Sequence, residues 1–190
     1  MARFFFVDII TNIDLIDRVI ERDSKIADDA VNLVPKTDAT LVKSLSLDFN
    51  DPVPVPYPIN TAGAEDSPFI LPDGKTLYIF FTPDVRVPVE KQVIDGVTGI
   101  YMAENINGEW QKPKRVFLQE PKKAGSDGCE FVQNDVMYFC SVREGYSGIH
   151  WFKADYIDGK WQNWRIADKE LKTEQYKTGE LHISKDGQEL

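Results

Sequence analysis

An internal repeat limits the possible folds of this chain more than any other feature of its sequence. Ser67–Phe81 is an apolar run, a Pro-Asp-Gly turn and a second apolar run, and Gly99–Val116 adds two runs around an Asn-Gly turn. Cys129–Ser141 and Gly148–Ile166 repeat this order. Short apolar runs separated by Gly, Asn and Asp turns are typical of β-hairpins. Each unit is therefore expected to form four antiparallel strands.

Individual residues recur with the units. Gly99 is matched by Gly148 at a spacing of 49, and Trp110 by Trp161 at a spacing of 51. Repeated tryptophans indicate packing between units rather than stacking on a sugar. In the second unit the Pro-Asp-Gly turn shortens to Asn-Asp. The aligned residues are Phe69, Tyr78, Ile100 and Trp110 in the first unit, and Phe131, Tyr138, Ile149 and Trp161 in the second.

The last residues begin a third copy. Within Gly179–Leu190, Leu181 and Ile183 alternate with polar residues, and Asp186-Gly187 predicts a turn. A second strand is expected to begin near Leu190. A hairpin with one arm leaves backbone groups unpaired, so we expect either further sequence or another chain to complete the sheet, and we favour further sequence.

The size of the repeat predicts the fold class. A lone four-stranded sheet buries one face well, and units of this length bury the other by packing side by side, as the blades of a β-propeller do. The prediction is an all-β fold of propeller blades, each of four antiparallel strands. Two complete blades and a truncated third occupy residues 58–190. Propellers close with about four to eight blades, so the predicted propeller is partial.

Several motifs resemble a known family. Asp66-Ser67-Pro68-Phe69 followed by Pro72–Tyr78 resembles the DxSPxxSPDGKxLYF core of WD40-like propeller repeats of the TolB type. Ser141, Arg143, Gly145 and Ile149 are similar to that family's SxRxGxxxI segment. Gly108-Glu109-Trp110 and Gly159-Lys160-Trp161 resemble the turn that often closes such blades. The resemblance covers about two-thirds of the chain and implies an architecture more than a function.

Residues 1–57 form a separate N-terminal region in this prediction. Asn12–Ser24 is the one convincing helix, since Asn12 can cap it and its isoleucines fall on one face. We expect this helix to pack on its own domain, with binding to a partner as the alternative. Asp51–Pro58 has a proline at every second position and predicts an extended linker.

Charge and targeting features exclude some classes of function. The chain has 22 Lys and Arg against 31 Asp and Glu, a net charge of −9. This acidic balance argues against a nucleic-acid partner and against binding to anionic membranes. No apolar run is long enough to predict membrane insertion. Asp8 interrupts the apolar start of the chain, so we predict no signal peptide. The localisation stays undecided, and the resemblance would allow a periplasmic or secreted protein.

Four acids are the candidate catalytic residues. Glu65, Asp66, Glu130 and Glu180 each lie near the start of a predicted innermost strand. A pair of carboxylates close to a propeller axis would suit glycoside hydrolysis. The acids also fall at similar places in the repeat, which would ring the axis with carboxylates whatever the function. We favour this second interpretation.

The remaining chemistry-bearing residues suggest neither a metal nor a cofactor. His150 and His182 are the only histidines, and Cys129 and Cys140 lack the spacing of a zinc site. Nucleotide-binding glycine motifs and a nucleophile elbow are absent from the sequence, so no cofactor is predicted. His182 and Arg143 are the candidates for side chains that face a ligand, whereas His150 is expected to pack against other side chains.

The cysteines allow one geometric prediction. If Asn134-Asp135 is a two-residue turn, Phe131 pairs with Tyr138 and Cys129 with Cys140. That pair would be within reach of a disulfide. Because side chains at a hydrogen-bonded pair diverge, we favour two free thiols.

Three functions remain open at this stage. The first is a non-catalytic propeller that binds a protein or a carbohydrate. The second is a glycoside hydrolase-like propeller that uses axial carboxylates. The third is a chain that associates with its own copies through an open blade edge.

Overall fold

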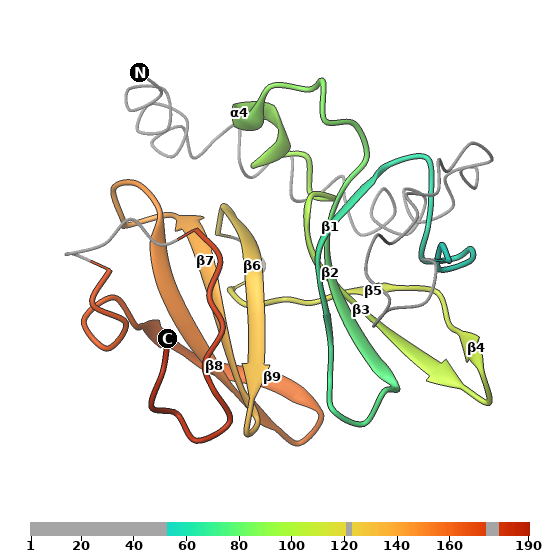
Figure 1. Ribbon diagram of the computed structural model, residues 1–190. Helices are drawn as coiled ribbons and strands as arrows, with labels where there is room; N and C mark the ends of the chain where they lie inside the picture. The colour runs from blue at the N-terminus through green and yellow to red at the C-terminus, as the bar shows by residue number, and fades with distance from the viewer. Residues whose placement is uncertain (1–52, 121–122, 174–178) are drawn as a thin grey trace, which may run out of the picture.

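The computed structural model describes residues 53–120, 123–173 and 179–190, and these form two antiparallel β-sheets (Figure 1). The first sheet has the order β1-β2-β3-β4, with β5 also paired to β3. The all-β prediction is confirmed for this part of the chain. The strands of the first sheet are β1 (Ala64–Ile70), β2 (Thr76–Thr82), β3 (Gly99–Ile106), β4 (Glu109–Trp110) and β5 (Lys114–Arg115).

The second sheet is a four-stranded meander in the order β6-β7-β8-β9. The hairpins Ser67–Phe81 and Cys129–Ser141 therefore lie in separate, adjacent sheets, as the repeat predicted. The strands of the second sheet are β6 (Gly125–Gln133), β7 (Val136–Arg143), β8 (His150–Ile157) and β9 (Lys160–Ile166).

The predicted turns take the backbone conformations that their residues favour. Gly74 in the Pro-Asp-Gly turn has φ 68°, a left-handed value. Asn134 and Asp135 both have positive φ, and so do Asp158 and Gly159. Two successive left-handed residues match the twist of paired strands, which is why such dipeptides form tight hairpins.

The main core lies between the two sheets. Tyr78 and Ile100 from the first sheet pack with Met137 and Phe139 from the second. The rings of Tyr78 and Trp161 meet edge to face, with centroids 6.2 Å apart. The two sheets thus bury apolar faces against each other.

Each sheet also has apolar residues on its other face. In the first sheet, Leu77, Ile79 and Tyr101 pack with Ile59. In the second sheet, Trp151 packs with Ala167 and Leu171, and Leu181 of the C-terminal segment lies against this cluster. The second sheet is therefore covered on both sides, by the first sheet and by residues that follow β9.

Two of the aligned repeat positions, Gly148 and Ile149, are wrong. Phe80 pairs with Ile100 in the first sheet, and its equivalent, Cys140, pairs with Trp151 in the second. Ile100 therefore corresponds to Trp151, whereas Ile149 lies outside the strands and is 66% exposed. The error of two residues arises because Gly148 belongs to the loop before β8, and loop length does not follow strand register.

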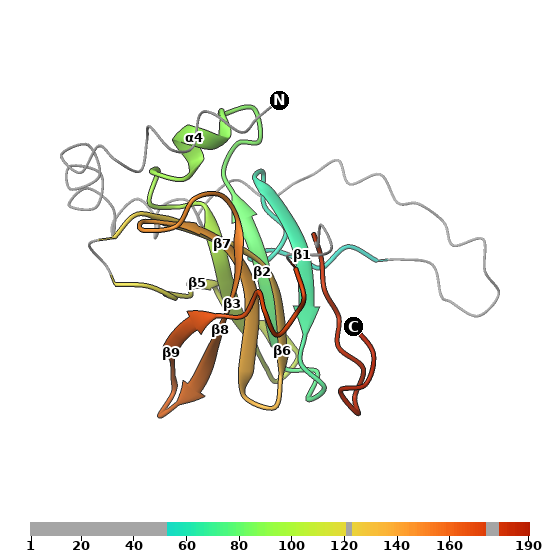
Figure 2. The ribbon, with the colours of Figure 1, turned by 90° about the vertical axis from the view of Figure 1, so that its left-hand side faces the viewer.

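The C-terminal segment, residues 179–190, runs beside the first strands of both sheets (Figure 2). The amide group of Gln133 in β6 donates to the backbone oxygen of Ser184, at 3.1 Å. The predicted Asp186-Gly187 turn is confirmed, since Gly187 has φ 72° and its N–H donates to the Ser184 carbonyl. No strand is assigned within this segment, contrary to the prediction of a strand before the turn.

The insertion between β2 and β3 contains the short helix α4 (Val89–Gln92). Asp95 accepts hydrogen bonds from the backbone N–H groups of Val97 and Thr98 and so closes the loop onto β3. The predicted helix Asn12–Ser24 lies outside the described residues. The part of the chain that the structure describes contains no helix with the length and apolar character that a membrane span requires.

Candidate functional site

The first strand of each sheet is interrupted by a β-bulge at the same place in the repeat. In β1 the irregularity lies between Asp66 and Phe69, and in β6 between Gly128 and Phe131. Ser67 and Cys129 occupy the first bulge position and have φ of 47° and 55°. Left-handed backbone is uncommon for residues other than glycine, and bulges of this kind redirect side chains next to functional sites.

The two bulged residues meet a third residue from the C-terminal segment. The Ser67 hydroxyl donates to Oε1 of Glu180 at 3.1 Å. Interaction with the Cys140 thiol and burial raise the pKa of the Cys129 thiol, and the nearby Glu180 carboxylate adds to the rise. Segments far apart in the sequence thus converge at one point on the molecule.

A row of aromatic rings follows this convergence. The rings of Phe69 and Phe131 meet edge to face with centroids 5.1 Å apart, and those of Phe131 and His182 at 4.9 Å. Ser67, Cys129 and Glu180 each precede one of these rings by two residues. This shared offset is the sequence signal that could have identified Ser67 and Cys129 as members of the site.

Glu130 is the most unusual residue of this region. Its side chain is buried, with the residue 5% exposed, and neither carboxylate oxygen has a hydrogen-bond partner among the described residues. Burial raises its pKa to about 8, and the nearby Cys129, Glu180 and Asp66 add to the rise. Glu130 therefore holds a proton at neutral pH. A buried polar group without a partner costs folding free energy and calls for an explanation.

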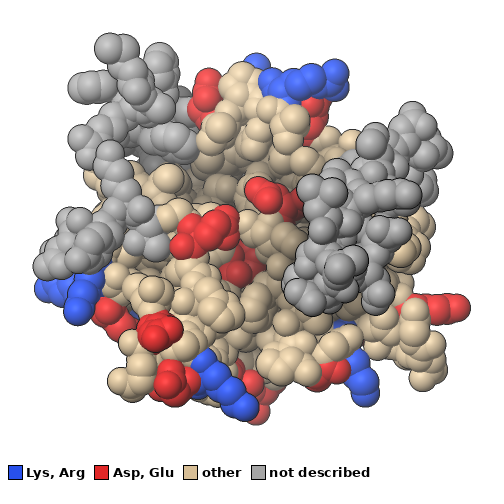
Figure 3. Space-filling model, viewed as in Figure 1, with Lys and Arg blue, Asp and Glu red and all other residues tan. Residues whose placement is uncertain are grey.

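We call Asp66, Glu130 and Glu180 the acidic centre. Unlike buried Glu130, Asp66 and Glu180 are exposed. Figure 3 shows acidic side chains gathered around a hollow in the middle of the face viewed there. The ion pairs among the described residues use other acids, so no Lys or Arg of this part of the chain neutralises the acidic centre.

The fourth predicted acid, Glu65, has a local role. The hydroxyl and the backbone N–H of Thr61 both donate to its Oε1. Glu65 pairs with Phe81, and the equivalent pair in the second sheet is Asp127 with Ser141. The four acids therefore occupy different positions of the repeat, and Pro68 stands where the second sheet has Glu130.

Arg143, predicted to face a ligand, lies inside the second sheet. Its guanidinium donates to Asp127 at 2.7 Å and to the Ser141 hydroxyl at 2.9 Å. It also lies 4.2 Å from the centre of the Phe152 ring. Since the residue is 8% exposed, these intramolecular contacts occupy it. Of the two predicted ligand-facing residues, only His182 is exposed.

The cysteine register differs from the prediction. Phe131 pairs with Tyr138 as expected, but the bulge shifts the register so that Gly128, not Cys129, pairs with Cys140. Both thiols are free. Interaction with the Cys140 thiol, followed by burial, raises the pKa of Cys129 well above its ordinary value. A high pKa disfavours the thiolate, so Cys129 is a poor nucleophile at neutral pH.

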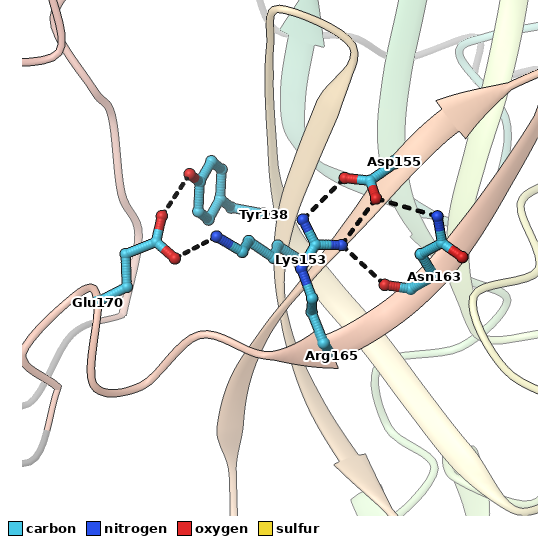
Figure 4. Close-up of polar contacts among 6 residues, drawn as sticks. All are labelled: Tyr138, Lys153, Asp155, Asn163, Arg165 and Glu170. Carbon is cyan, nitrogen blue, oxygen red and sulfur yellow. Dashed lines mark hydrogen bonds and ion pairs between the residues drawn. The ribbon is translucent and has the colours of Figure 1, made fainter.

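A second polar network covers the outer part of the second sheet (Figure 4). The Tyr138 hydroxyl donates to Glu170 at 2.9 Å, and Lys153 forms an ion pair with the same carboxylate. Arg165 donates to both oxygens of Asp155. Because every charged group of this network has a partner, it has the character of a structural clamp.

His150 also has a structural position. Its Nδ1 lies 2.5 Å from Asp168, which accepts the backbone N–H of Trp151 as well. Among the described residues, no three His, Cys, Asp or Glu side chains are placed to hold one metal ion.

Comparisons with known proteins do not assign the chain to a family. No family model, no curated protein and no solved structure matches the chain.

Proposed function

We propose that the two sheets are neighbouring blades of a β-propeller of the WD40-like, TolB type. Two features support this architecture. Both sheets share one strand order and stack through apolar faces. The first strands and the C-terminal segment follow one another in space, joined by the contacts of Phe131 with Phe69 and with His182. In a propeller the first strands line the axis, where ligands commonly bind.

On this architecture the chain acts as a non-catalytic binding module, with the acidic centre as its ligand site. The observation that carries this proposal is Glu130, whose two carboxylate oxygens are buried without a hydrogen-bond partner in the described part of the chain. Such a group destabilises the folded protein. A ligand that supplies hydrogen-bond donors or positive charge would satisfy it, so the residue is better explained by binding than by folding.

Thermal unfolding in the presence of candidate ligands tests the binding function. A ligand that binds the native state raises the melting temperature by mass action. The expected result is a rise for at least one member of a panel of monosaccharides, disaccharides and small amines, which disappears in Glu180→Gln. The matched control is Glu104→Gln, an exposed acid on β3, in which the rise should persist. A rise that survives Glu180→Gln would place the ligand elsewhere.

A glycoside hydrolase is the second candidate, favoured by the pKa of Glu130. At about 8 this pKa suits a general acid, and the exposed Glu180 would serve as the second carboxylate. We expect no turnover, because catalysis needs both carboxylates fixed in a productive geometry, and Glu180 is exposed on a segment to which no helix or strand belongs. Assays on a broad glycoside panel decide the matter, and activity abolished by Glu130→Gln or Glu180→Gln would replace the first proposal.

A further inference from the structure

Among the described residues, no positive charge is paired with the acidic centre. Three carboxyl groups and the Cys129 thiol act on one another there, and the neighbours that change the pKa of Glu130 are acidic. No Lys or Arg of the described residues forms an ion pair with Asp66, Glu130 or Glu180. With a net charge of −9 over the whole chain, long-range attraction also favours a cation over an anion or a neutral molecule.

The burial of the carboxyl groups indicates which kind of cation the acidic centre would bind. Glu130 is buried, while Glu180 and Asp66 are exposed, so the acids reach from the interior to the surface. The half-buried ring of Phe69 lies two residues after Ser67, which donates to Glu180, and it contacts Phe131, whose ring in turn contacts His182. Carboxylates beside aromatic rings suit an organic cation, because the rings attract the charge and contact the carbon atoms.

Resting on the binding function proposed above, we propose that the acidic centre binds the ammonium group of an organic amine, with Glu130 and Glu180 as its carboxylate partners. An ammonium group carries three N–H donors. It can therefore donate to more than one carboxylate oxygen at the same time. Glu180 accepts a hydrogen bond from Ser67 through Oε1, and its exposed carboxylate can accept further donors.

Proton release distinguishes an amine from a neutral ligand. In the free protein Glu130 holds a proton below about pH 8, and a carboxylate that receives an ammonium must be ionised. The O–H bond of Glu130 then breaks, the electron pair stays on the carboxylate, and the proton passes to the buffer. Affinity should therefore rise by about tenfold per pH unit from pH 6 to pH 8 and level off above.

Other titratable groups near Glu130 affect its ionisation or lie next to it. Asp66, Glu180 and Cys129 act on it directly, and His182 packs against the neighbouring Phe131. The pH profile should persist in His182→Gln, which removes the imidazole. It should vanish in Glu130→Gln, which removes the proton.

Calorimetric titration of the full chain tests the inference. The probes are methylammonium, 1,4-diaminobutane and glucosamine, with glucose and magnesium chloride as neutral and metal-ion comparisons. Amine affinity is expected to fall by about tenfold or more in Glu130→Gln and in Glu180→Gln, and to stay the same in Glu104→Gln. Titrations at pH 7 in two buffers of different ionisation enthalpy should show nearly one proton released per amine. Circular dichroism verifies that each variant is folded. If Glu130→Gln does not fold, Glu180→Gln still tests the inference, because Glu180 is exposed.

The outcomes separate the inference from the proposed function. Glucose binding that depends on Glu130, without amine binding, would overturn the ammonium inference and leave the binding site intact. Tight binding of magnesium in place of the amines would also overturn the inference. If none of the probes binds, or if binding is equal in the parent and in both variants, both the inference and the acidic centre as a ligand site fail.

Discussion

The two sheets share one frame and differ where their first strands bulge. Both strands break register after the same pairing, and both place a left-handed residue there, Ser67 in β1 and Cys129 in β6. The next residue is Pro68 in the first sheet and Glu130 in the second. Since proline fills the position in one copy, the repeat does not require an acid in the other. The comparison indicates that Glu130 serves something other than the fold.

Their environments explain why only one of these two positions is buried. Pro68 is exposed. Next to Glu130, the ring of Phe131 contacts the first sheet through Phe69 and the C-terminal segment through His182. A first strand with neighbours on both sides encloses its bulge.

Equivalent faces of the two sheets also differ in what they contact. Tyr78 and Met102 are paired in the first sheet and pack into the core between the sheets. The equivalent pair, Tyr138 and Lys153, joins Glu170 in the polar network of the second sheet (Figure 4). Equivalent strand positions thus contribute to the apolar core in one copy and to a charged network in the other.

The largest expected effect is a pH dependence of the unfolding free energy that comes from Glu130 of the second sheet. Native Glu130 keeps its proton up to about pH 8, whereas the unfolded chain loses it near 4.5. The parent therefore loses stability as pH rises through this window. The unfolding free energy of Glu130→Gln, relative to that of the parent, should increase by about 1.4 kcal/mol per pH unit between these two pH values. Above about pH 8 this difference should stay constant. Urea unfolding followed by tryptophan fluorescence measures the slope, and a constant difference between the two proteins would contradict it.

Asp127 and Glu65 occupy equivalent positions with different partners. Asp127→Ala leaves the Arg143 guanidinium buried without its carboxylate, which should cost about 3 to 5 kcal/mol of unfolding free energy. Glu65→Ala removes a half-buried acceptor of Thr61 and should cost about 1 kcal/mol. Denaturant midpoints measure both. Equal losses would show that Arg143 finds another partner.

Gly128 tests the contact between the sheets. A Cβ added there would lie 3.1 Å from the Phe80 ring of the first sheet. Gly128→Leu should therefore destabilise by about 1 to 3 kcal/mol. Gly179, three residues before His182 as Gly128 is before Phe131, has open space around it. Gly179→Leu is the control and should leave the melting temperature unchanged, and a harmless Gly128→Leu would refute the stacking.

Gly74 gives a smaller effect than Gly128. Its φ of 68° is strained for a β-branched residue, while no atom lies near an added Cβ. Gly74→Val should cost about 1 to 2 kcal/mol through backbone strain alone. Gly74→Asn, which tolerates left-handed backbone, should cost less. A melting curve in which the two variants coincide would show that the turn relaxes.

The sequence predicted the features that depend on local chemistry. The Asp-Gly, Asn-Gly and Asn-Asp dipeptides located the hairpin turns, because positive φ at those positions is a property of the residues themselves. Counting outward from Asn134-Asp135 gave the correct partner for Phe131. The same count failed at Cys129, because a bulge inserts one residue and nothing in the alternation of side chains marks it.

The acidic centre depended on contacts that no local pattern contains. Glu130 was named as a candidate with three other acids, but its burial results from the first sheet and the C-terminal segment meeting around β6. The alternation of strand residues does not report this depth. The sequence does not reveal that Arg143 is paired inside the sheet, because its partner Asp127 lies 16 residues away in another strand. The prediction that Arg143 faces a ligand followed from this missing information.

The ionisation of Glu130 tests the central claim most directly. Carbon-13 NMR of the side-chain carboxyl, assigned by comparison with Glu130→Gln, follows its protonation state in the folded protein. The structure predicts a titration midpoint near pH 8 in the free chain. A midpoint near 4.5, the ordinary value for a glutamate, would contradict the account, since it would mean that solvent or a neighbouring donor already satisfies the carboxylate.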